Sequence, residues 1–185
     1  MNRRAVATII AVVLMFVGLN WNRFARDAGE PVFLHEPSGV WVLLGEGFSD
    51  VGAVRQFDDG CRLESVIELT NYGFAAGVQK IISDNPRIES GRRIDLVLQE
   101  TEIESISFSW MTAGQRVSLG IPLHPDRMTL NDWEFLPGVG AKTAVRIERN
   151  RQENGDFGDF EQLRRIKGVG SSKMASWSQF FLKKG

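Results

Sequence analysis

The chain has 185 residues, 43% of them hydrophobic and 24% charged, and a formal net charge of −1 at pH 7. That length is enough for a small membrane anchor and two modest domains, each able to bury a core. The single cysteine, Cys61, excludes an intramolecular disulfide, so the domains must be held together by core packing. We expect Cys61 itself to be a small buried hydrophobe.

An uncharged run lies near the start of the chain. It covers residues 5–21, after Arg3 and Arg4, and as a helix it would span roughly 25 Å, which is short for a bilayer but within range. Its end is a poor cleavage site, which favours an uncleaved anchor over a signal peptide. We therefore predict a membrane anchor or signal-anchor helix at residues 1–22 and a linker at residues 23–39.

Short apolar runs separated by turns fill residues 40–122. They predict strands at 40–44, 51–57, 94–98, 103–110 and 117–121, and one short amphipathic helix at 63–69. Within 103–110, Ile106, Phe108 and Trp110 alternate with serines, which is the period of a sheet with one wet face. This order of elements predicts a small α+β domain.

The same region carries a resemblance to a known module. Residues 42–60, followed by Leu63, Val66 and Ile67, resemble the β-grasp module called SLBB. The resemblance implies an SLBB-like β-grasp domain at residues 40–122. We interpret it as a spacer or as a contact for an envelope protein partner rather than as a glycan site.

One pattern occurs twice in residues 123–185, at an offset of 30 residues. The copies read Leu136-Pro137-Gly138-Val139-Gly140-Ala141-Lys142-Thr143-Ala144 and Ile166-Lys167-Gly168-Val169-Gly170-Ser171-Ser172-Lys173-Met174. Two glycines around one apolar residue let the chain reverse within a few residues, so each copy predicts helix, tight turn, helix. The second helices should begin at Ala141 and Ser171, and Thr129 with Asp132 predicts a capping box for the first helix.

These hairpins are the candidate binding site. The unpaired amides and positive dipole end of each second helix suit a phosphate oxygen. Nearby lysines and hydroxyls would position a nucleic-acid backbone without reading its bases. The candidate DNA-binding residues are Gly138, Val139, Gly140, Lys142, Thr143, Arg146, Gly168, Val169, Gly170, Ser172 and Lys173. For Arg146, the alternative is a solvated, mixed-charge helix surface.

The repeat also resembles a family. The residues that carry the resemblance are Leu136-Pro137-Gly138-Val139-Gly140, Ala144, Ile147, Arg151, Asn154-Gly155, Phe157, Leu163 and Gly168-Val169-Gly170. They resemble the tandem helix-hairpin-helix domain, and more closely that of ComEA-type competence DNA receptors, in which an SLBB-like module often lies between the anchor and the hairpins. The resemblance implies that two hairpins grip successive phosphates of double-stranded DNA across a minor groove. The lead-in at residues 123–128 departs from the family.

The expected function follows from these features. From residue 128 onward there are 10 Lys and Arg against 7 Asp and Glu, a balance of +3, whereas residues 22–127 carry 10 against 16, a balance of −6. We expect a single-pass protein of the inner membrane that binds double-stranded DNA without sequence preference, with its domains facing the periplasm or cell exterior, for DNA uptake in competence. One alternative is an envelope scaffold whose domains only contact proteins. Another is a chromosome or repair tether with its domains in the cytoplasm.

The sequence predicts no catalytic constellation, cofactor or metal site. His35 and His124 are far apart and have no ligands at metal-binding spacing, and Glu100, Glu102 and Glu104 suit a solvated face. The aromatic residues of the repeat are more typical of a core than of base-stacking platforms. They are Trp133, Phe135, Phe157, Phe160, Trp177, Phe180 and Phe181.

Overall fold

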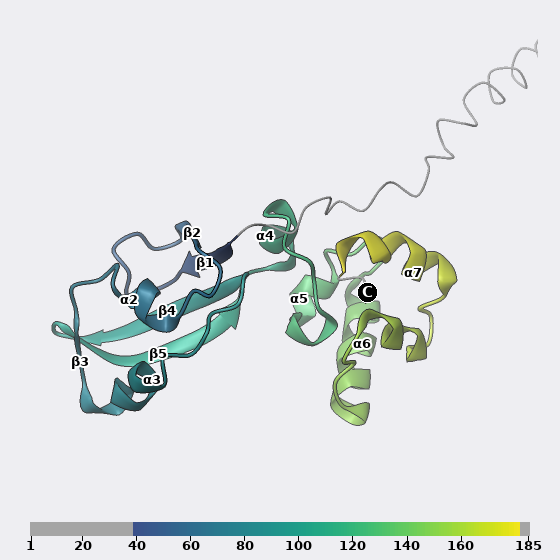
Figure 1. The fold of residues 1–185 in the computed structure, drawn as a ribbon. Coiled ribbons are helices and arrows are strands. Elements are labelled where there is room, and N and C mark those ends of the chain that lie inside the picture. Colours follow the sequence, from purple (N-terminus) through teal and green to yellow (C-terminus); the bar gives the residue numbers. More distant parts are fainter. Residues whose placement is uncertain (1–38, 182–185) are drawn as a thin grey trace, which may run out of the picture. The chain divides into compact units, whose positions relative to one another are not determined.

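The computed structural model of the chain describes residues 39–181, in which a mixed β-sheet is followed by a helical region (Figure 1). This arrangement fits the predicted α+β class. The predicted anchor at residues 1–22 and nearly all of the predicted linker lie outside the described residues. Between residues 39 and 181, no helix combines the length and the apolar character needed to cross a membrane.

The sheet has five strands in the order β2-β1-β4-β5-β3. The strands are β1 (Val40–Leu44), β2 (Val54–Phe57), β3 (Gly73–Phe74), β4 (Arg92–Gln99) and β5 (Glu102–Trp110). β1 pairs antiparallel with β2 and parallel with β4, and β4 forms a long antiparallel hairpin with β5. A parallel pair needs a crossover connection, and the segment between β2 and β4 supplies it with helical turns. The SLBB-like assignment of this domain stays a prediction.

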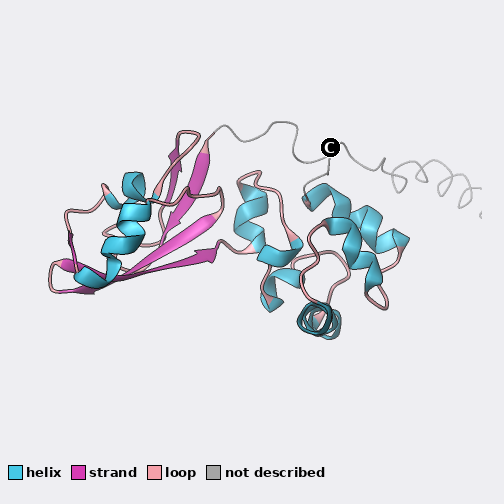
Figure 2. Cartoon of the chain, turned by 60° about the horizontal axis from the view of Figure 1, so that its bottom comes forward, coloured by secondary structure: helices cyan, strands magenta, loops and turns pink. Residues whose placement is uncertain are grey.

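Helices cover one face of the sheet (Figure 2). They are α2 (Leu63–Ile67), the 3₁₀ helix η1 (Ala76–Val78) and α3 (Gln79–Asp84). Apolar residues of α2 pack against Ile94 and Leu96 of β4, and Cys61 is buried in the same core, as predicted. Burial raises the pKa of the Cys61 thiol. On the other face the serines of β5 are exposed, which confirms the predicted wet face.

The predicted strand at 117–121 is wrong, because its first two residues end helix α4 (Ala113–Ser118) and the next two form a turn. Thr112 and Gln115 form a reciprocal capping box, and this local start signal outweighs the strand preference of Val117. After α4, Ile121 packs with Met111 against Leu43 of β1 in a small second core.

Other element boundaries also differ from the prediction. The strand predicted from residue 51 begins only at residue 54, because a turn with Gly52 at a φ of 83° precedes it. The helix predicted at 63–69 ends at residue 67. Neither η1, α3 nor the short strand β3 was predicted.

The helical region contains both copies of the repeat around one core. Its elements are η2 (Pro125–Arg127), α5 (Leu130–Trp133), α6 (Ala141–Asn154), η3 (Phe160–Arg165), α7 (Ser171–Trp177) and η4 (Ser178–Phe180). Trp133, Ile147, Leu163 and Trp177 meet in this core and are fully buried. The predicted capping box between Thr129 and Asp132 is present. The assignment of Phe135 to the core is wrong, because 42% of it is exposed.

The lead-in that departs from the ComEA pattern is anchored through Asp126. This residue lies in η2, and its carboxylate accepts hydrogen bonds from the amides of Phe157 at 2.7 Å and Gly158 at 2.8 Å. Arg151 of α6 donates to the carbonyl of Met128 at 3.1 Å. The lead-in is therefore fixed to the segment that joins the two copies.

Candidate nucleic-acid interface

The two hairpins share one backbone conformation. Gly138 and Gly168 have φ angles of 73° and 91°, in the left-handed region that favours glycine. The amide of Val139 donates to the carbonyl three residues earlier at 3.1 Å, and the amide of Val169 does the same at 3.0 Å. Both valines are buried, while the glycines beside them are exposed. Each turn is therefore anchored in the core by its valine.

Gly140 and Gly170 end the hairpins and are the N-cap residues of α6 and α7, whose starts at Ala141 and Ser171 are those predicted. Their φ angles are −106° and −100°, which residues with side chains adopt freely. A Cβ added at either position would meet no atom within 4 Å. Neither backbone conformation nor packing within the described residues therefore requires glycine here, and open space lies beside the start of both helices.

The first amides of both helices are unpaired. Gly140 and Gly170 have no side chain that could cap them. The amides in question are those of Ala141, Lys142, Ser171 and Ser172. Within the described part of the chain, none of them donates a hydrogen bond. Unpaired amides at the positive end of a helix attract anions, and the glycines leave room for an approaching oxygen.

The two candidate lysines do not occupy equivalent positions. The offset of 30 residues pairs Lys142 with Ser172 and Thr143 with Lys173. Lys142 is exposed on the first turn of α6, whereas Lys173 is half-buried on α7. The Cε atom of Lys173 lies 4.0 Å from where a Cβ of Gly138 would be. Both lysines therefore lie by the first hairpin, one from each copy.

The second hairpin receives its positive charge from Arg146 of α6. The Nη1 atom of Arg146 donates to the carbonyl of Lys167 at 2.6 Å and lies 2.9 Å from where a Cβ of Gly168 would be. Arg146 follows Lys142 by about one turn of the same helix, but its guanidinium lies at the other hairpin. Lys167 itself is exposed.

Trp177 was not among the predicted site residues, yet it contacts the first hairpin. Its Nε1 atom donates to the carbonyl of Pro137 at 2.8 Å. The sequence carried only a weak signal for this contact. At the position equivalent to Trp177, the first copy has Ile147, whose side chain has no hydrogen-bond donor. A buried tryptophan usually finds an acceptor for its N–H group.

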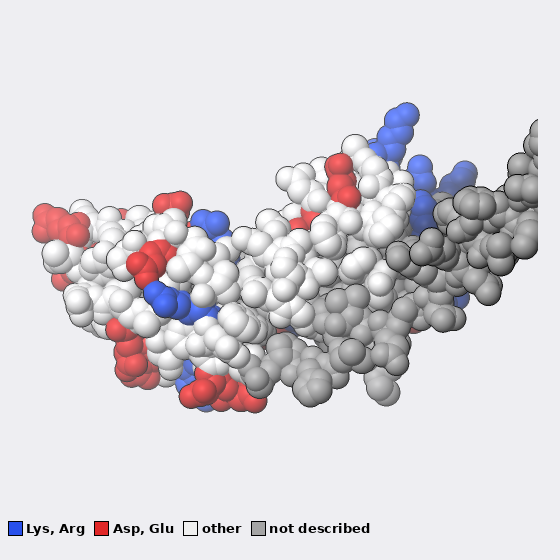
Figure 3. Space-filling model, turned by 90° about the horizontal axis from the view of Figure 1, so that it is seen from above, with Lys and Arg blue, Asp and Glu red and all other residues white. Residues whose placement is uncertain are grey.

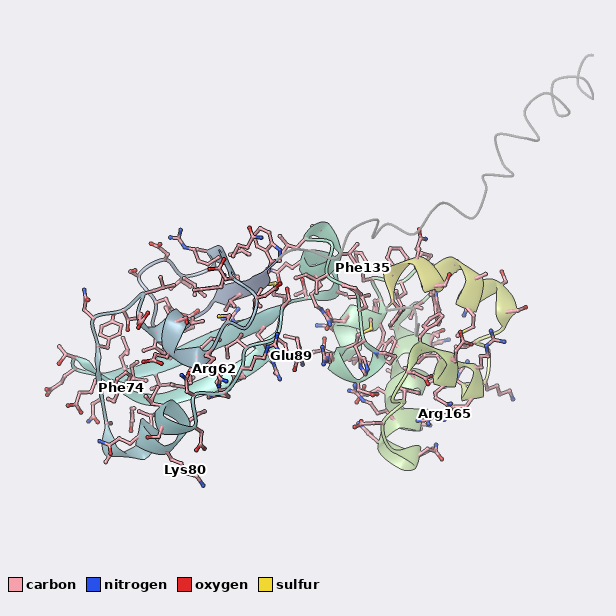
Figure 4. The ribbon with its side chains drawn as sticks, in the orientation of Figure 1. Arg62, Phe74, Lys80, Glu89, Phe135 and Arg165 are labelled. Carbon is pink, nitrogen blue, oxygen red and sulfur yellow. The ribbon has the colours of Figure 1, made fainter. Side chains whose placement is uncertain are left out.

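Several other basic residues of this region have internal partners. Arg151 pairs with Glu148 at 2.7 Å, and Arg164 pairs with Glu161 at 2.8 Å. Arg165 lies 4.4 Å above the ring of Phe157 and is exposed (Figure 4). These three arginines are therefore tied to their own surface rather than to the hairpins.

Charge is distributed unevenly over the surface. In the view of Figure 3, acidic side chains gather over the sheet, and basic side chains stand out over the helical region. Glu100, Glu102 and Glu104, at the hairpin between β4 and β5, are exposed as predicted. Among residues 39–181, no group of three or more His, Cys, Asp or Glu could hold a metal ion. His124 accepts a hydrogen bond from the amide of Asp126 through Nδ1 at 3.3 Å.

Comparison with known proteins supports the assignment of the repeat. Residues 129–182 match the family described as the helix-hairpin-helix motif. The match covers both hairpins, and this motif indicates nucleic-acid binding in general. No curated protein matches the chain.

Proposed function

We propose that this chain binds double-stranded DNA through its phosphate backbone, without sequence preference and without catalysing a reaction. One observation carries the proposal. Gly140 and Gly170 occupy equivalent positions before unpaired helix amides, where nothing in the described fold requires glycine. An external group that approaches the backbone closely explains glycine at both places. The helix-hairpin-helix match supports a nucleic acid as that group.

The chemistry of binding is electrostatic. Hairpin amides and the cations beside them, Lys142 and Lys173 at one hairpin and Arg146 and Lys167 at the other, replace counterions on the phosphates. Phosphate contacts fix position but carry no sequence information. With about four phosphates engaged, the logarithm of the affinity falls with the logarithm of the salt concentration at a slope of roughly −3 to −4.

We propose further that the protein is a membrane-anchored receptor for DNA uptake. It rests on the uncharged run at residues 5–21 and on the resemblance to ComEA-type receptors. Residues 1–22 would anchor the chain in the inner membrane, and the SLBB-like domain would act as a spacer or protein contact outside the cytoplasm. Protease treatment of spheroplasts tests the orientation: digestion of the domains supports this arrangement, and their protection supports a cytoplasmic tether.

Charge reversal tests DNA binding directly. In the variant Lys142→Glu, Lys173→Glu, each new carboxylate lies in the first turn of a helix, where a negative charge is favourable, so the protein should fold. We expect fluorescence anisotropy with a labelled duplex to show at least a 100-fold loss of affinity, because two cations become two anions.

The matched control is Lys80→Glu, Arg87→Glu, which changes the net charge equally but lies in the sheet domain. Lys80 points away from α3 (Figure 4), and both residues are exposed. The control should bind the duplex within about threefold of the wild-type protein, because these cations contact no phosphate. Equal losses in both variants would contradict a hairpin site.

The alternative is an envelope scaffold that binds proteins only. The exposed side chains of Leu130 and Phe135 in the helical region favour this possibility. The same titration separates the two functions, because a scaffold would not bind the duplex even at low salt.

A further inference from the structure

The two hairpin carbonyls that precede Gly138 and Gly168 are each held by the other copy of the repeat. Pro137 and Lys167 are equivalent under the offset of 30 residues. The carbonyl of Pro137 accepts a hydrogen bond from Trp177 of α7, and that of Lys167 accepts one from Arg146 of α6. The helix that follows the hairpin in each copy is therefore bonded to the hairpin of the other copy.

The donors differ chemically but occupy related places. The offset pairs Trp177 with Ile147, the residue next to Arg146. Each donor therefore lies in the second turn of an α-helix. Each bond ends at the carbonyl oxygen of the equivalent residue in the opposite hairpin. This reciprocity fixes the position of one hairpin relative to the other.

We infer that Trp177 and Arg146 are positioning residues, which hold the two hairpins at the spacing at which both contact one duplex. This inference rests on the proposed function. A ligand that bridges two sites binds more tightly when the sites are already arranged, because less conformational freedom is lost on binding. Trp177 is fully buried, so it acts on DNA only through the hairpin that it holds.

The chain contains a matched control for Trp177. Trp133 is also fully buried in the same core, but its Nε1 atom has no hydrogen-bond partner in the described structure. Trp177→Phe and Trp133→Phe therefore remove the same atoms from one core. Only the first removes a bond to a hairpin.

The experiment measures duplex affinity by anisotropy for the full chain, kept in a mild detergent, and for both variants well below their melting temperatures. Trp177→Phe should weaken binding between about threefold and tenfold with an unchanged salt slope, since it removes one hydrogen bond and no charge. Trp133→Phe should stay within about twofold of the wild-type protein. Equal affinities of the two variants would overturn the inference.

A second measurement does not depend on DNA. Hydrogen exchange of the Val139 amide in the free protein should be at least about threefold faster in Trp177→Phe than in Trp133→Phe, because the first hairpin opens more often. Should Trp177→Phe fail to fold, the analogue 3-benzothienylalanine at position 177 keeps the ring shape and removes only the N–H group. Unchanged exchange in that protein would overturn the positioning role.

Arg146→Met completes the test at the second hairpin. It removes both the bond to Lys167 and one positive charge, so the affinity should fall and the salt slope should become shallower by about one. An unchanged affinity would overturn the role of Arg146. Failure of the wild-type chain to bind any duplex would instead refute the proposed function, while the exchange measurement would still test the bond itself.

Discussion

Two carboxylates, Asp95 and Asp126, show how single side chains secure the loops of this protein. Asp95 on β4 accepts a hydrogen bond from the amide of Glu46 at 2.8 Å and pairs with Arg93 at 2.6 Å. Asp126 binds two amides of the segment between the copies of the repeat. Each links segments far apart in the chain, so neither role could be predicted from local sequence.

The contacts of Asp95 predict a pH dependence of stability. The hydrogen bond from Arg93 lowers the pKa of Asp95, and the Glu46 amide lowers it further. A carboxyl whose pKa is lower in the folded state contributes stability above its unfolded pKa, and this contribution is lost as the pH falls through the folded pKa.

Asp95→Asn should therefore lower the free energy of unfolding at pH 7 by about 1 kcal/mol, since the Arg93 pair is partly solvent-screened. The difference from the wild-type protein should shrink below about pH 4, where Asp protonates in the unfolded chain. Urea unfolding at a series of pH values measures this difference. A difference that stays constant down to pH 2 would show that the charge of Asp95 contributes nothing.

At the scale of elements, the hairpins use glycine for two separate reasons. Gly138 and Gly168 are required by a left-handed backbone, whereas Gly140 and Gly170 leave free space beside unpaired helix amides. Stability and binding should therefore respond differently at the two kinds of position.

Gly140→Ser with Gly170→Ser should preserve or raise the melting temperature, because serine is a good N-cap and its hydroxyl can accept from the free amides. The same hydroxyls would compete with phosphate, so we expect duplex affinity to fall at least about tenfold. Gly138→Ala should instead lower stability by about 1 kcal/mol, because alanine disfavours a positive φ. Thermal melting and anisotropy on the same samples check both. Unweakened binding in the serine variant would mean that no phosphate reaches these amides.

Local signals explain which elements could be predicted from the sequence. The hairpins and the start of α6 could be predicted because the glycines that define them lie within a few residues of each other. The repeat could be predicted because the two copies are separated by a constant 30 residues. The segment at 117–121 was misassigned because strand propensity was weighed without the Thr112 and Gln115 capping box. The bonds of Trp177 and Arg146 to the hairpins cross 40 and 21 residues of sequence, and no local pattern contains such contacts.

At the scale of the whole molecule, polar contacts join the sheet domain to the helical region. Asp132 of α5 accepts a hydrogen bond from the amide of Ala113 at the start of α4, and its carboxylate lies 3.8 Å from the buried guanidinium of Arg116. Arg127 lies 4.5 Å above the ring of Trp110 and pairs with Glu89. The acidic sheet domain is therefore in direct contact with the basic helical region. We expect it to contribute little to DNA binding.

The two hairpins together should bind the phosphates of any duplex, whatever its sequence. The most direct test titrates two labelled duplexes of unrelated sequence with the full chain, in a mild detergent, at several salt concentrations. If both hairpins bind phosphates, the two affinities should lie within about threefold of each other, and the slope of log affinity against log salt should be roughly −3 to −4. This binding mode would be contradicted by a folded protein that fails to bind at low salt, by a slope near zero, or by a strong preference for one of the two sequences.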